Sequence, residues 1–245
     1  MIDFSAAKAI TIPEGSIANI QVGGSTIWRK HAISFGDLLY ELSEDRKHYV
    51  VAGVQDGVTK TSFTFQNTVN GLPVSDVAEN AFAGLSGLTI CINGEIDLAD
   101  APWGTTTPNL YIDGIRYRQT TTTSRKPDYV VATPNSDFKG GVVNILGRIG
   151  SIVVSEINSS TFSGYTNITE VIIPAEIRWI ETSIFRNCTN LKKVTFKGKP
   201  ETTTTSVFTG CTNLTDIYVP WAEGEVANAP WGAPNATIHY NYVEE

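Results

Sequence analysis

The stretch Phe185-Arg-Asn-Cys-Thr-Asn-Leu191 has two close relatives in the chain, Phe162-Ser-Gly-Tyr-Thr-Asn-Ile168 and Phe208-Thr-Gly-Cys-Thr-Asn-Leu214. The three phenylalanines are evenly spaced along the sequence, so the stretch recurs with a constant period. A fixed period in this range is typical of a solenoid, in which each repeat is one supersecondary unit stacked on its neighbour. The spacing therefore predicts a stack of similar coils, each of which buries one phenylalanine.

Each repeat carries two further apolar elements around this stretch. An apolar-x-x-apolar step comes before the phenylalanine, as Ile177 and Ile180 do before Phe185. A short β-type run follows it, as in Val194-Thr-Phe196. No single repeat can bury all of these side chains alone, so the repeats are expected to stack on one another.

This pattern resembles the BspA-like family of leucine-rich repeats, whose units read approximately I-x-x-I-x-x-x-x-F-x-x-C-x-x-L-x-x-I-x-I-P. The match covers at least residues 150–220. The resemblance implies a β-rich solenoid with at most a minor α+β part. It also implies a binding scaffold more often than an enzyme.

Length and charge narrow the class of protein. The 245 residues allow one or two domains. The net charge of −7 argues against nucleic acid as a partner, because a phosphate backbone needs a basic surface. The sequence contains no run of about 18 apolar residues, so we expect no membrane-spanning helix and no membrane partner. Met1-Ile-Asp-Phe-Ser5 does not read as a signal peptide, and three cysteines fit a reduced compartment, so we expect synthesis in a cytoplasm.

The second half of the chain repeats the first. Tyr49 corresponds to Tyr129, and Phe82 corresponds to Phe162 with the same offset in sequence. We interpret residues 36–114 as a first leucine-rich-repeat module and residues 115–245 as a longer second module. The second module adds the repeats of Phe185 and Phe208. Whether the two modules form one continuous solenoid stays open at this point.

Both modules end in Ala-Pro-Trp-Gly, at residues 101–104 and 229–232. Trp231 follows Phe208 by one full period and Trp103 follows Phe82 by slightly less than one, so each tryptophan takes the phenylalanine position of a degenerate repeat. The open end of a solenoid exposes apolar side chains and strand edges, which a large aromatic ring can cover. We therefore interpret Trp103 and Trp231 as caps of their modules. A binding role is the alternative.

Residues 1–35 read as a β-hairpin segment with Gly23-Gly24 as its turn. A lone hairpin is marginal in water, so this segment must pack on the rest of the chain or on a partner. Residues 10–28 resemble the N-terminal segment of many tailed-phage virion proteins, and residues 219–240 resemble the C-terminal end of phage-encoded BspA-like proteins. The resemblance implies attachment to a particle, and an ordinary edge hairpin is the alternative. The expected attachment residues are Ile10, Ile12, Ile17, Ile20, Ile27 and Trp28.

The sequence contains no recognisable catalytic or metal-binding motif. The three histidines have no Cys or His partner at metal-ligand spacing, and no nucleophile, phosphate-loop or metalloprotease motif is present. We expect no catalytic residue, no metal and no cofactor. Cys188 and Cys211 occupy equivalent positions of adjacent repeats. A ladder of buried free thiols is the favoured interpretation, and a disulfide is geometrically allowed.

One charge feature stands out. Residues 178–199 contain six Lys or Arg residues and a single acid, Glu181. In a solenoid these side chains can gather into a basic stripe beside Trp179, suited to an anionic cell-wall polymer or an acidic neighbouring protein. A solvated face is the alternative. The candidate ligand-contact residues are Trp179, Lys192, Lys193 and Lys197.

These observations lead to one functional hypothesis and its alternatives. We expect a non-enzymatic tailed-phage virion protein, assembled in the bacterial host cytoplasm. It would be mounted on other virion proteins by its N-terminal segment and would bind a host cell-surface polymer or protein through its repeats. A homo-oligomer on the particle is expected. The main alternative is a purely structural capsid or tail decoration protein, while a bacterial surface adhesin and an enzyme are less favoured.

Overall fold

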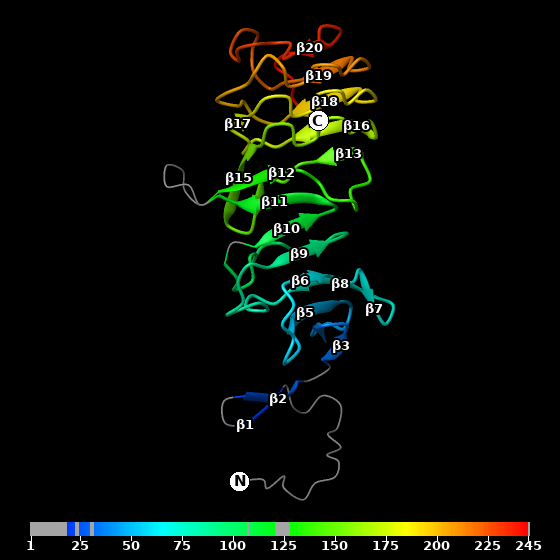
Figure 1. Cartoon of the computed structure of the whole chain (residues 1–245), viewed down its shortest axis with the longest axis vertical. Coiled ribbons are helices and arrows are strands. Elements are labelled where there is room, and N and C mark those ends of the chain that lie inside the picture. The colour runs from blue at the N-terminus through cyan, green and yellow to red at the C-terminus, as the bar shows by residue number, and fades with distance from the viewer. Residues whose placement is uncertain (1–18, 23–24, 30–31, 107, 121–127, 245) are drawn as a thin grey trace, which may run out of the picture.

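The computed structural model is a column of stacked β-strands (Figure 1). It describes residues 19–22, 25–29, 32–106, 108–120 and 128–244. Within these residues the chain forms twenty strands and no helix. The predicted β-rich solenoid is thus confirmed, and the minor helical part that the family resemblance allowed is absent from the described residues.

Three sheets build the column. The first sheet lies at its N-terminal end, in the order β3 (Ile33–Phe35), β4 (Leu38–Leu42), β5 (Tyr49–Val54), β8 (Leu72–Val77) and β7 (Thr68–Val69). The junction sheet crosses the middle, in the order β14 (Arg148–Ile149), β15 (Ile152–Ile157), β12 (Tyr129–Ala132), β11 (Ile115–Gln119), β10 (Asn109–Ile112), β9 (Thr89–Ile92) and β6 (Ser62–Thr64), with β17 (Trp179–Ile180) beside β15. The C-terminal ladder is β13 (Gly141–Asn144), β16 (Ile168–Ile173), β18 (Lys193–Phe196), β19 (Asp216–Tyr218) and β20 (Thr237–His239).

The period of the repeat sets the register of the C-terminal ladder. Its strands are all parallel, and Val171 pairs with Val194, which in turn pairs with Ile217. These three side chains are buried in the core. Each repeat therefore adds one strand to the ladder and places its equivalent residue beside that of the preceding repeat, as the constant period predicts.

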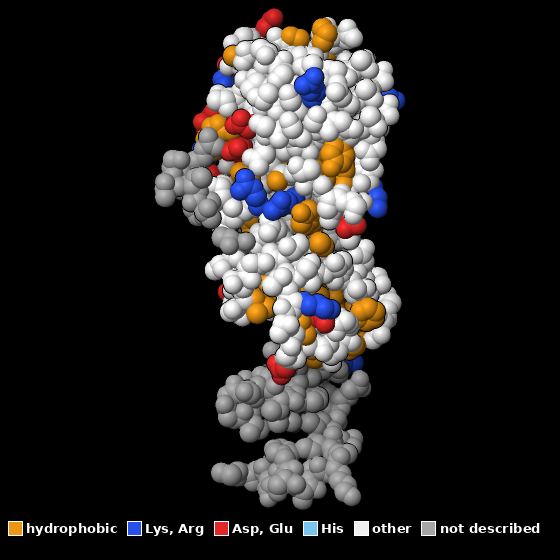
Figure 2. Space-filling model, in the orientation of Figure 1, with side chains coloured by type: hydrophobic (Ala, Val, Ile, Leu, Met, Phe, Trp, Pro, Cys, Tyr) orange, Lys and Arg blue, Asp and Glu red, His pale blue; other side chains and the backbone are white. Residues whose placement is uncertain are grey.

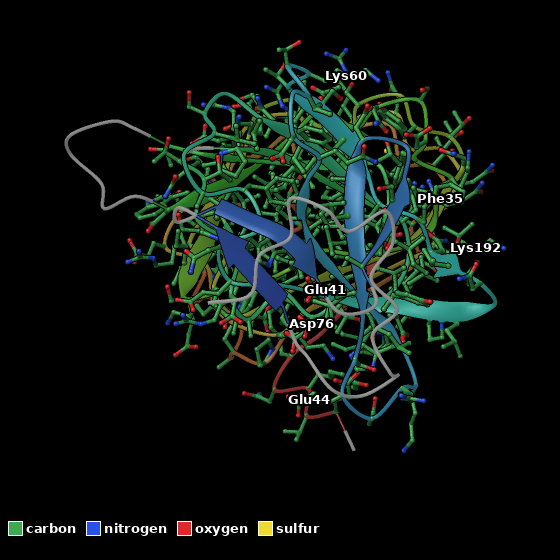
Figure 3. The ribbon with its side chains drawn as sticks, turned by 90° about the horizontal axis from the view of Figure 1, so that it is seen from below. Phe35, Glu41, Glu44, Lys60, Asp76 and Lys192 are labelled. Atoms are coloured by element: carbon green, nitrogen blue, oxygen red, sulfur yellow. The ribbon has the colours of Figure 1, made fainter. Side chains whose placement is uncertain are left out.

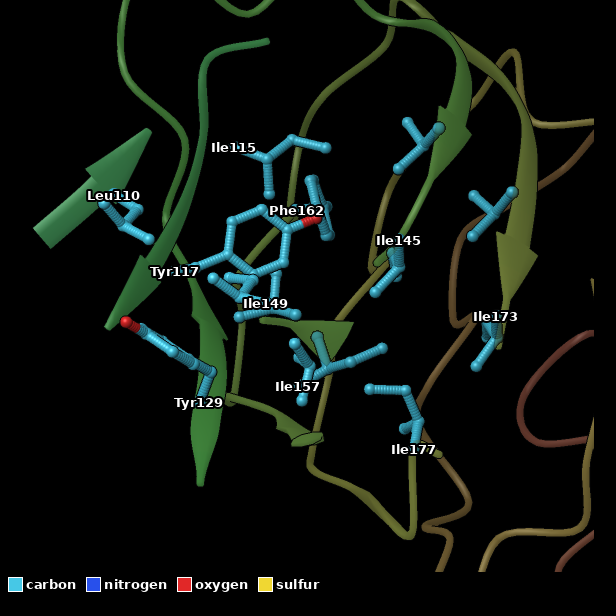
Figure 4. Close-up of a cluster of buried hydrophobic side chains, with 14 of the residues drawn as sticks. Leu110, Ile115, Tyr117, Tyr129, Ile145, Ile149, Ile157, Phe162, Ile173 and Ile177 are labelled. Carbon is cyan, nitrogen blue, oxygen red and sulfur yellow. The ribbon is translucent and has the colours of Figure 1, made fainter. Parts of the chain in front are cut away.

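A stack of phenylalanines runs through the core beside this ladder. The ring centroids of Phe162 and Phe185 are 5.2 Å apart with planes 2° from parallel, and those of Phe185 and Phe208 are 5.7 Å apart at 14°. All three side chains are fully buried. Figure 4 shows Phe162 among aliphatic side chains from the junction sheet and the ladder, including Ile157 and Ile173. The repeat register is confirmed.

Equivalent contacts recur in the two halves of the chain. Tyr49 pairs with Val74 in β5–β8, and their counterparts Tyr129 and Val154 pair in β12–β15. The hydroxyl of Tyr40 accepts a hydrogen bond of 3.2 Å from the backbone N–H of Gln66. A second bond of the same kind and length joins Tyr117 Oη to the N–H of Leu146.

The junction sheet joins the two halves. β10 pairs in parallel with β9 on one side and antiparallel with β11 on the other. The sheet therefore continues from β6, β9 and β10 of the first half into β11, β12 and β15 of the second half. Trp103 lies inside the column at this level, fully buried against Phe65 and Phe82, whose ring centroids are 6.0 Å and 6.4 Å away.

Close packing of the two halves leaves the Tyr129 hydroxyl without a partner among the described residues. The hydroxyl of Tyr49 accepts a hydrogen bond from Asn70 Nδ2 at 3.3 Å. Gly150 takes the place of Asn70 in the second half, and a Cβ there would lie 2.3 Å from the carbonyl oxygen of Ala101. Tyr129 Oη consequently has no partner among the described residues, and burial raises the pKa of Tyr129 to about 12.

This difference gives a paired prediction. Tyr129→Phe is expected to raise the free energy of unfolding by about 1 kcal/mol, because it removes a buried hydroxyl that makes no hydrogen bond. Tyr49→Phe is expected to lower it by about 1 kcal/mol, because Asn70 loses its acceptor. Urea unfolding of the two variants checks both signs. Equal effects at the two positions would contradict this account.

The N-terminal segment forms the predicted hairpin in its described part. β1 (Asn19–Val22) pairs antiparallel with β2 (Ser25–Arg29), on either side of the predicted turn position. Three of the expected attachment residues lie outside the described residues, namely Ile10, Ile12 and Ile17. The other three lie in β1 or β2, namely Ile20, Ile27 and Trp28.

Candidate binding surfaces

The C-terminal ladder presents a flat outer face to solvent. Val171, Val194 and Ile217 are buried, whereas the residues just before them, Glu170, Lys193 and Asp216, are only half-buried. Thr195, which follows Val194, is buried as well. Register places the outward residues in rows that run along the column. We define the outer face by Glu170, Lys193, Asp216, Thr237, Tyr218 and His239.

Side chains of successive coils stack on this outer face. Lys193 Nζ lies 2.9 Å from Glu170 Oε1 and 5.6 Å from the ring centroid of Tyr218. The rings of Tyr218 and His239 are stacked, with centroids 4.3 Å apart and planes 11° from parallel. His239 Nε2 in turn lies 2.7 Å from Asp216 Oδ1. The face therefore combines partly exposed rings with fixed charged groups, a combination that suits a polar partner.

Neighbouring charges tune the ionisation of this face. The hydrogen bond and charge of Glu170 raise the pKa of Lys193. Hydrogen bonds from Thr215 and His239 lower the pKa of the Asp216 carboxyl below its usual range. Lys193 and Asp216 consequently remain charged at neutral pH.

The structure does not bring the predicted ligand-contact residues together. Trp179 lies in β17 beside the junction sheet, whereas Lys193 lies in β18 of the C-terminal ladder. The Arg178 side chain stacks on Trp179, with its guanidinium carbon 4.5 Å from the ring centroid, and so lies beside β17. A single basic stripe beside Trp179 is therefore not formed.

Most charges of the predicted stripe have acidic partners. Arg178 lies 3.6 Å from Asp128 and 3.7 Å from Glu201. Lys193 pairs with Glu170, Lys197 with Glu244, and Lys199 with Glu225. Lys192 is exposed, makes no ion pair with the described residues, and reaches outward from the column in Figure 3. The positive charge of this region is thus largely neutralised in place.

Cys188 and Cys211 are free buried thiols in adjacent coils. Each Sγ donates to a backbone carbonyl of the preceding coil, at 3.0 Å to Phe162 O and 2.9 Å to Phe185 O. The neighbouring Cys211 thiol and burial raise the pKa of the Cys188 thiol. The pair therefore belongs to the core, in agreement with the favoured thiol-ladder interpretation.

A cleft lies where the two halves of the chain meet. It has a volume of about 570 Å³ and lies between the β10–β11 turn and the start of the C-terminal ladder. In Figure 2, Lys and Arg side chains gather over β11, and hydrophobic side chains reach the surface near β13. The sequence patterns described above do not predict this cleft. Its lining includes Asn93, Ile112, Asp113, Phe138, Lys139 and Val142.

The described residues contain no group of three or more His, Cys, Asp or Glu side chains placed to hold a metal ion. Separately, none of these residues belongs to a helix that is long and apolar enough to cross a membrane. Neither finding adds a site to the two surfaces above.

The fold and its register define a β-solenoid of leucine-rich repeats. Residues 149–226 match the family model of the BspA type leucine rich repeat region, in six copies, so this part of the chain carries repeats of that type. This match confirms the family resemblance of the repeats. The comparisons identify no catalytic family, and no match was found among curated proteins.

Three similar solved structures are bacterial leucine-rich-repeat proteins. The T. pallidum leucine rich repeat protein is 18% identical, with 76% of this chain and 80% of that chain covered and a TM-score of 0.32. A leucine rich cell surface protein from Faecalibacterium prausnitzii A2-165 is 13% identical, with 86% and 95% covered and a TM-score of 0.39. A leucine-rich repeat protein from Eubacterium ventriosum ATCC 27560 is 14% identical, with 76% and 77% covered and a TM-score of 0.29.

Proposed function

We propose that the protein is a non-enzymatic binding protein that meets its partner through the outer face of the C-terminal ladder. The observation that carries this proposal is the stack of Lys193, Tyr218 and His239 on neighbouring strands. Rings and charges held at strand spacing form a rigid surface, so little conformational entropy is lost when a ligand binds. The BspA-type repeats at residues 149–226 support a binding role.

The partner that fits this face best is a polar host cell-surface polymer or protein. Aromatic rings offer flat apolar contact, and the Asp216 and Lys193 groups offer acceptors and donors to hydroxyl or ionic groups. Because Glu170 and Asp216 flank Lys193, the face is of mixed charge. A polymer that carries both hydroxyls and charges suits it better than a purely anionic one.

We place this binding protein on the virion of a tailed phage, mounted on other virion proteins by residues 1–35. The resemblance of residues 10–28 and 219–240 to phage proteins supports this placement. Within the described part of the chain, the hairpin β1–β2 is a separate two-stranded sheet, which suits an attachment element that pairs with another protein. The mounting residues would include Ile20, Ile27 and Trp28.

Substitution of the outer-face rings tests the proposal. Tyr218→Ala combined with His239→Ala is expected to weaken binding to intact host cells or isolated wall polymer at least tenfold, because the two stacked rings on adjacent strands are lost. Tyr111→Ala is the matched control, since Tyr111 is a half-buried outward tyrosine on β10, away from the ladder. Binding is measured by cell pull-down and by titration with the polymer. Unchanged binding by the double variant would rule out the outer face.

The four ligand-contact residues predicted from the sequence need a separate binding experiment. A triple variant reverses three charges and leaves Trp179 in place; it combines Lys192→Glu, Lys193→Glu and Lys197→Glu. Weaker binding by this variant, with Trp179→Ala unchanged, would assign contact to the ladder side alone. Loss with Trp179→Ala alone would move the contact surface to β17.

The hairpin β1–β2 pairs with no other described strand, and this favours a second candidate function, a purely structural capsid or tail decoration protein. Such a protein would bind particles that lack it and would ignore host cells. Full-length protein added to depleted particles and to cells separates the two functions. Particle binding without cell binding would favour the structural role.

A further inference from the structure

The C-terminal ladder begins with an open edge inside the column. Among the described residues, β13 is the end strand of its sheet and pairs only with β16. Beyond its other edge lies the junction cleft, because β10 turns away to pair with β11 instead of continuing the ladder. An unpaired strand edge is a template for another strand.

Backbone hydrogen bonds show which groups of β13 are available. The N–H of Gly141 donates to Asn167 O at 2.8 Å, and the N–H of Ile145 donates to Ile172 O at 3.2 Å. Backbone groups of a parallel strand alternate between its two edges, so the N–H and C=O of Val142 and Asn144 point into the cleft. The Val142 side chain is also 57% exposed, which is unusual for a valine in a strand.

The surroundings of this edge are apolar with an acidic rim. A second hollow of about 440 Å³ adjoins the cleft and shares Ile112, Asp113 and Leu146 with it. The charged residues that line the two hollows are Glu95, Asp97, Asp113, Asp137 and Lys139. Four acids face one base, so the site favours a strand that carries basic residues.

The chain itself contains a strand with these properties. β2 (Ser25–Arg29) reads Ser-Thr-Ile-Trp-Arg, and the sequence continues with Lys30. Its hairpin is a two-stranded sheet, so β2 has an edge that β1 does not occupy. A hairpin of this size needs further pairing to be stable in water.

The hairpin cannot reach the cleft of its own chain. The link from Arg29 to Ile33 is short and spans at most about 14 Å. β3 lies at the N-terminal end of the column, whereas β13 lies beyond β6, β9 and β10 (Figure 1). The occupant must therefore come from another molecule.

We propose that β2 of a second copy of this chain adds to the open edge of β13 and fills the junction cleft. The interface is heterologous, because the N-terminal hairpin of one copy meets the middle of the next. Such contacts generate a closed ring or an open fibre according to the rotation between copies. This self-assembly does not depend on the ligand proposed for the outer face, but it uses the same strand β2 as the proposed attachment to other virion proteins, so one hairpin serves one of the two contacts at a time.

Sedimentation velocity of the full-length protein over a range of concentrations tests the proposal. Concentration-dependent assembly is expected for the natural chain. Val142→Pro is expected to weaken association at least tenfold, because it removes an N–H that points into the cleft and keeps the pairing with β16. Ser62→Pro is the matched control, because Ser62 holds the corresponding edge position of β6. A monomer at every concentration, or equal effects of the two prolines, would overturn the proposal.

Charge exchange gives a second test that does not disturb the strand edge. Glu95→Lys with Asp137→Lys is expected to weaken association, and so is Arg29→Glu with Lys30→Glu. Mixing these two variants is expected to restore association, detected by sedimentation, because the hairpin of each variant then meets a cleft of opposite charge on the other variant. Thermal unfolding confirms that each variant is folded. Failure of the mixture to associate, with both variants folded, would overturn the pairing of hairpin and cleft.

Discussion

Replacement of Phe185 by alanine is expected to lower the free energy of unfolding by about 3–5 kcal/mol. The ring is fully buried and lies between Phe162 and Phe208, with centroid distances of 5.2 Å and 5.7 Å. Alanine leaves a cavity between coils whose backbones are held together by hydrogen bonds, such as Phe185 N–H to Val207 O at 3.0 Å. The surroundings therefore cannot collapse to fill it.

Chemical denaturation of the natural chain and of Phe185→Ala measures this loss. Phe35→Ala is the control, because Phe35 is 51% exposed on edge strand β3 and should contribute less than about 1 kcal/mol. A loss at Phe185 no larger than that at Phe35 would mean that the repeats do not stack through their phenylalanines.

The stack was predictable because a period fixes a register. A constant spacing places equivalent side chains above one another wherever each coil closes, so Phe162, Phe185 and Phe208 had to meet once the coils stacked. Buried thiols followed from the same logic, since Cys188 and Cys211 share one position of the repeat. Fold class needs only this periodicity and the apolar steps around it.

The predicted basic stripe beside Trp179 does not form, and the length of the repeat explains why. Trp179 and Lys193 are separated in sequence by more than half of one coil. Half a coil separates the two sides of a solenoid, so β17 and β18 belong to different sheets. Counting charges along the sequence ignored this geometry. The acids that neutralise the stripe come from distant positions, such as Asp128 and Glu244.

The junction cleft depends on where the repetition is interrupted. Asp113-Gly114 between two isoleucines is a strong signal for a tight hairpin, and Ile112 does pair with Ile115 across it. This turn sends the chain from a parallel array into an antiparallel pair, which leaves β13 at the end of its sheet among the described strands. The turn was visible in the sequence, but the space that it opens depends on three-dimensional packing.

Replacement of Trp231 by alanine is expected to cost about 3–5 kcal/mol, but only in the last coils. Trp231 is buried at the C-terminal end, against Phe196 and Trp221, with ring centroids 5.8 Å and 6.3 Å away. Its Nε1 donates to Ala227 O at 2.8 Å, and its carbonyl accepts from Phe208 N–H at 2.9 Å. The residue thus covers the open end of the core, as the cap interpretation expects.

Solenoid stability is a sum of coil and nearest-neighbour contributions, so the loss should stay near the end that is opened. In hydrogen exchange, amides of β19 and β20 in Trp231→Ala should exchange at least tenfold faster, while those of β4 and β5 keep their rates. Trp231→Phe is the matched control, because it keeps a ring over the core and loses only the bond to Ala227. Faster exchange spread evenly over the column would show that Trp231 supports the whole fold instead of closing its end.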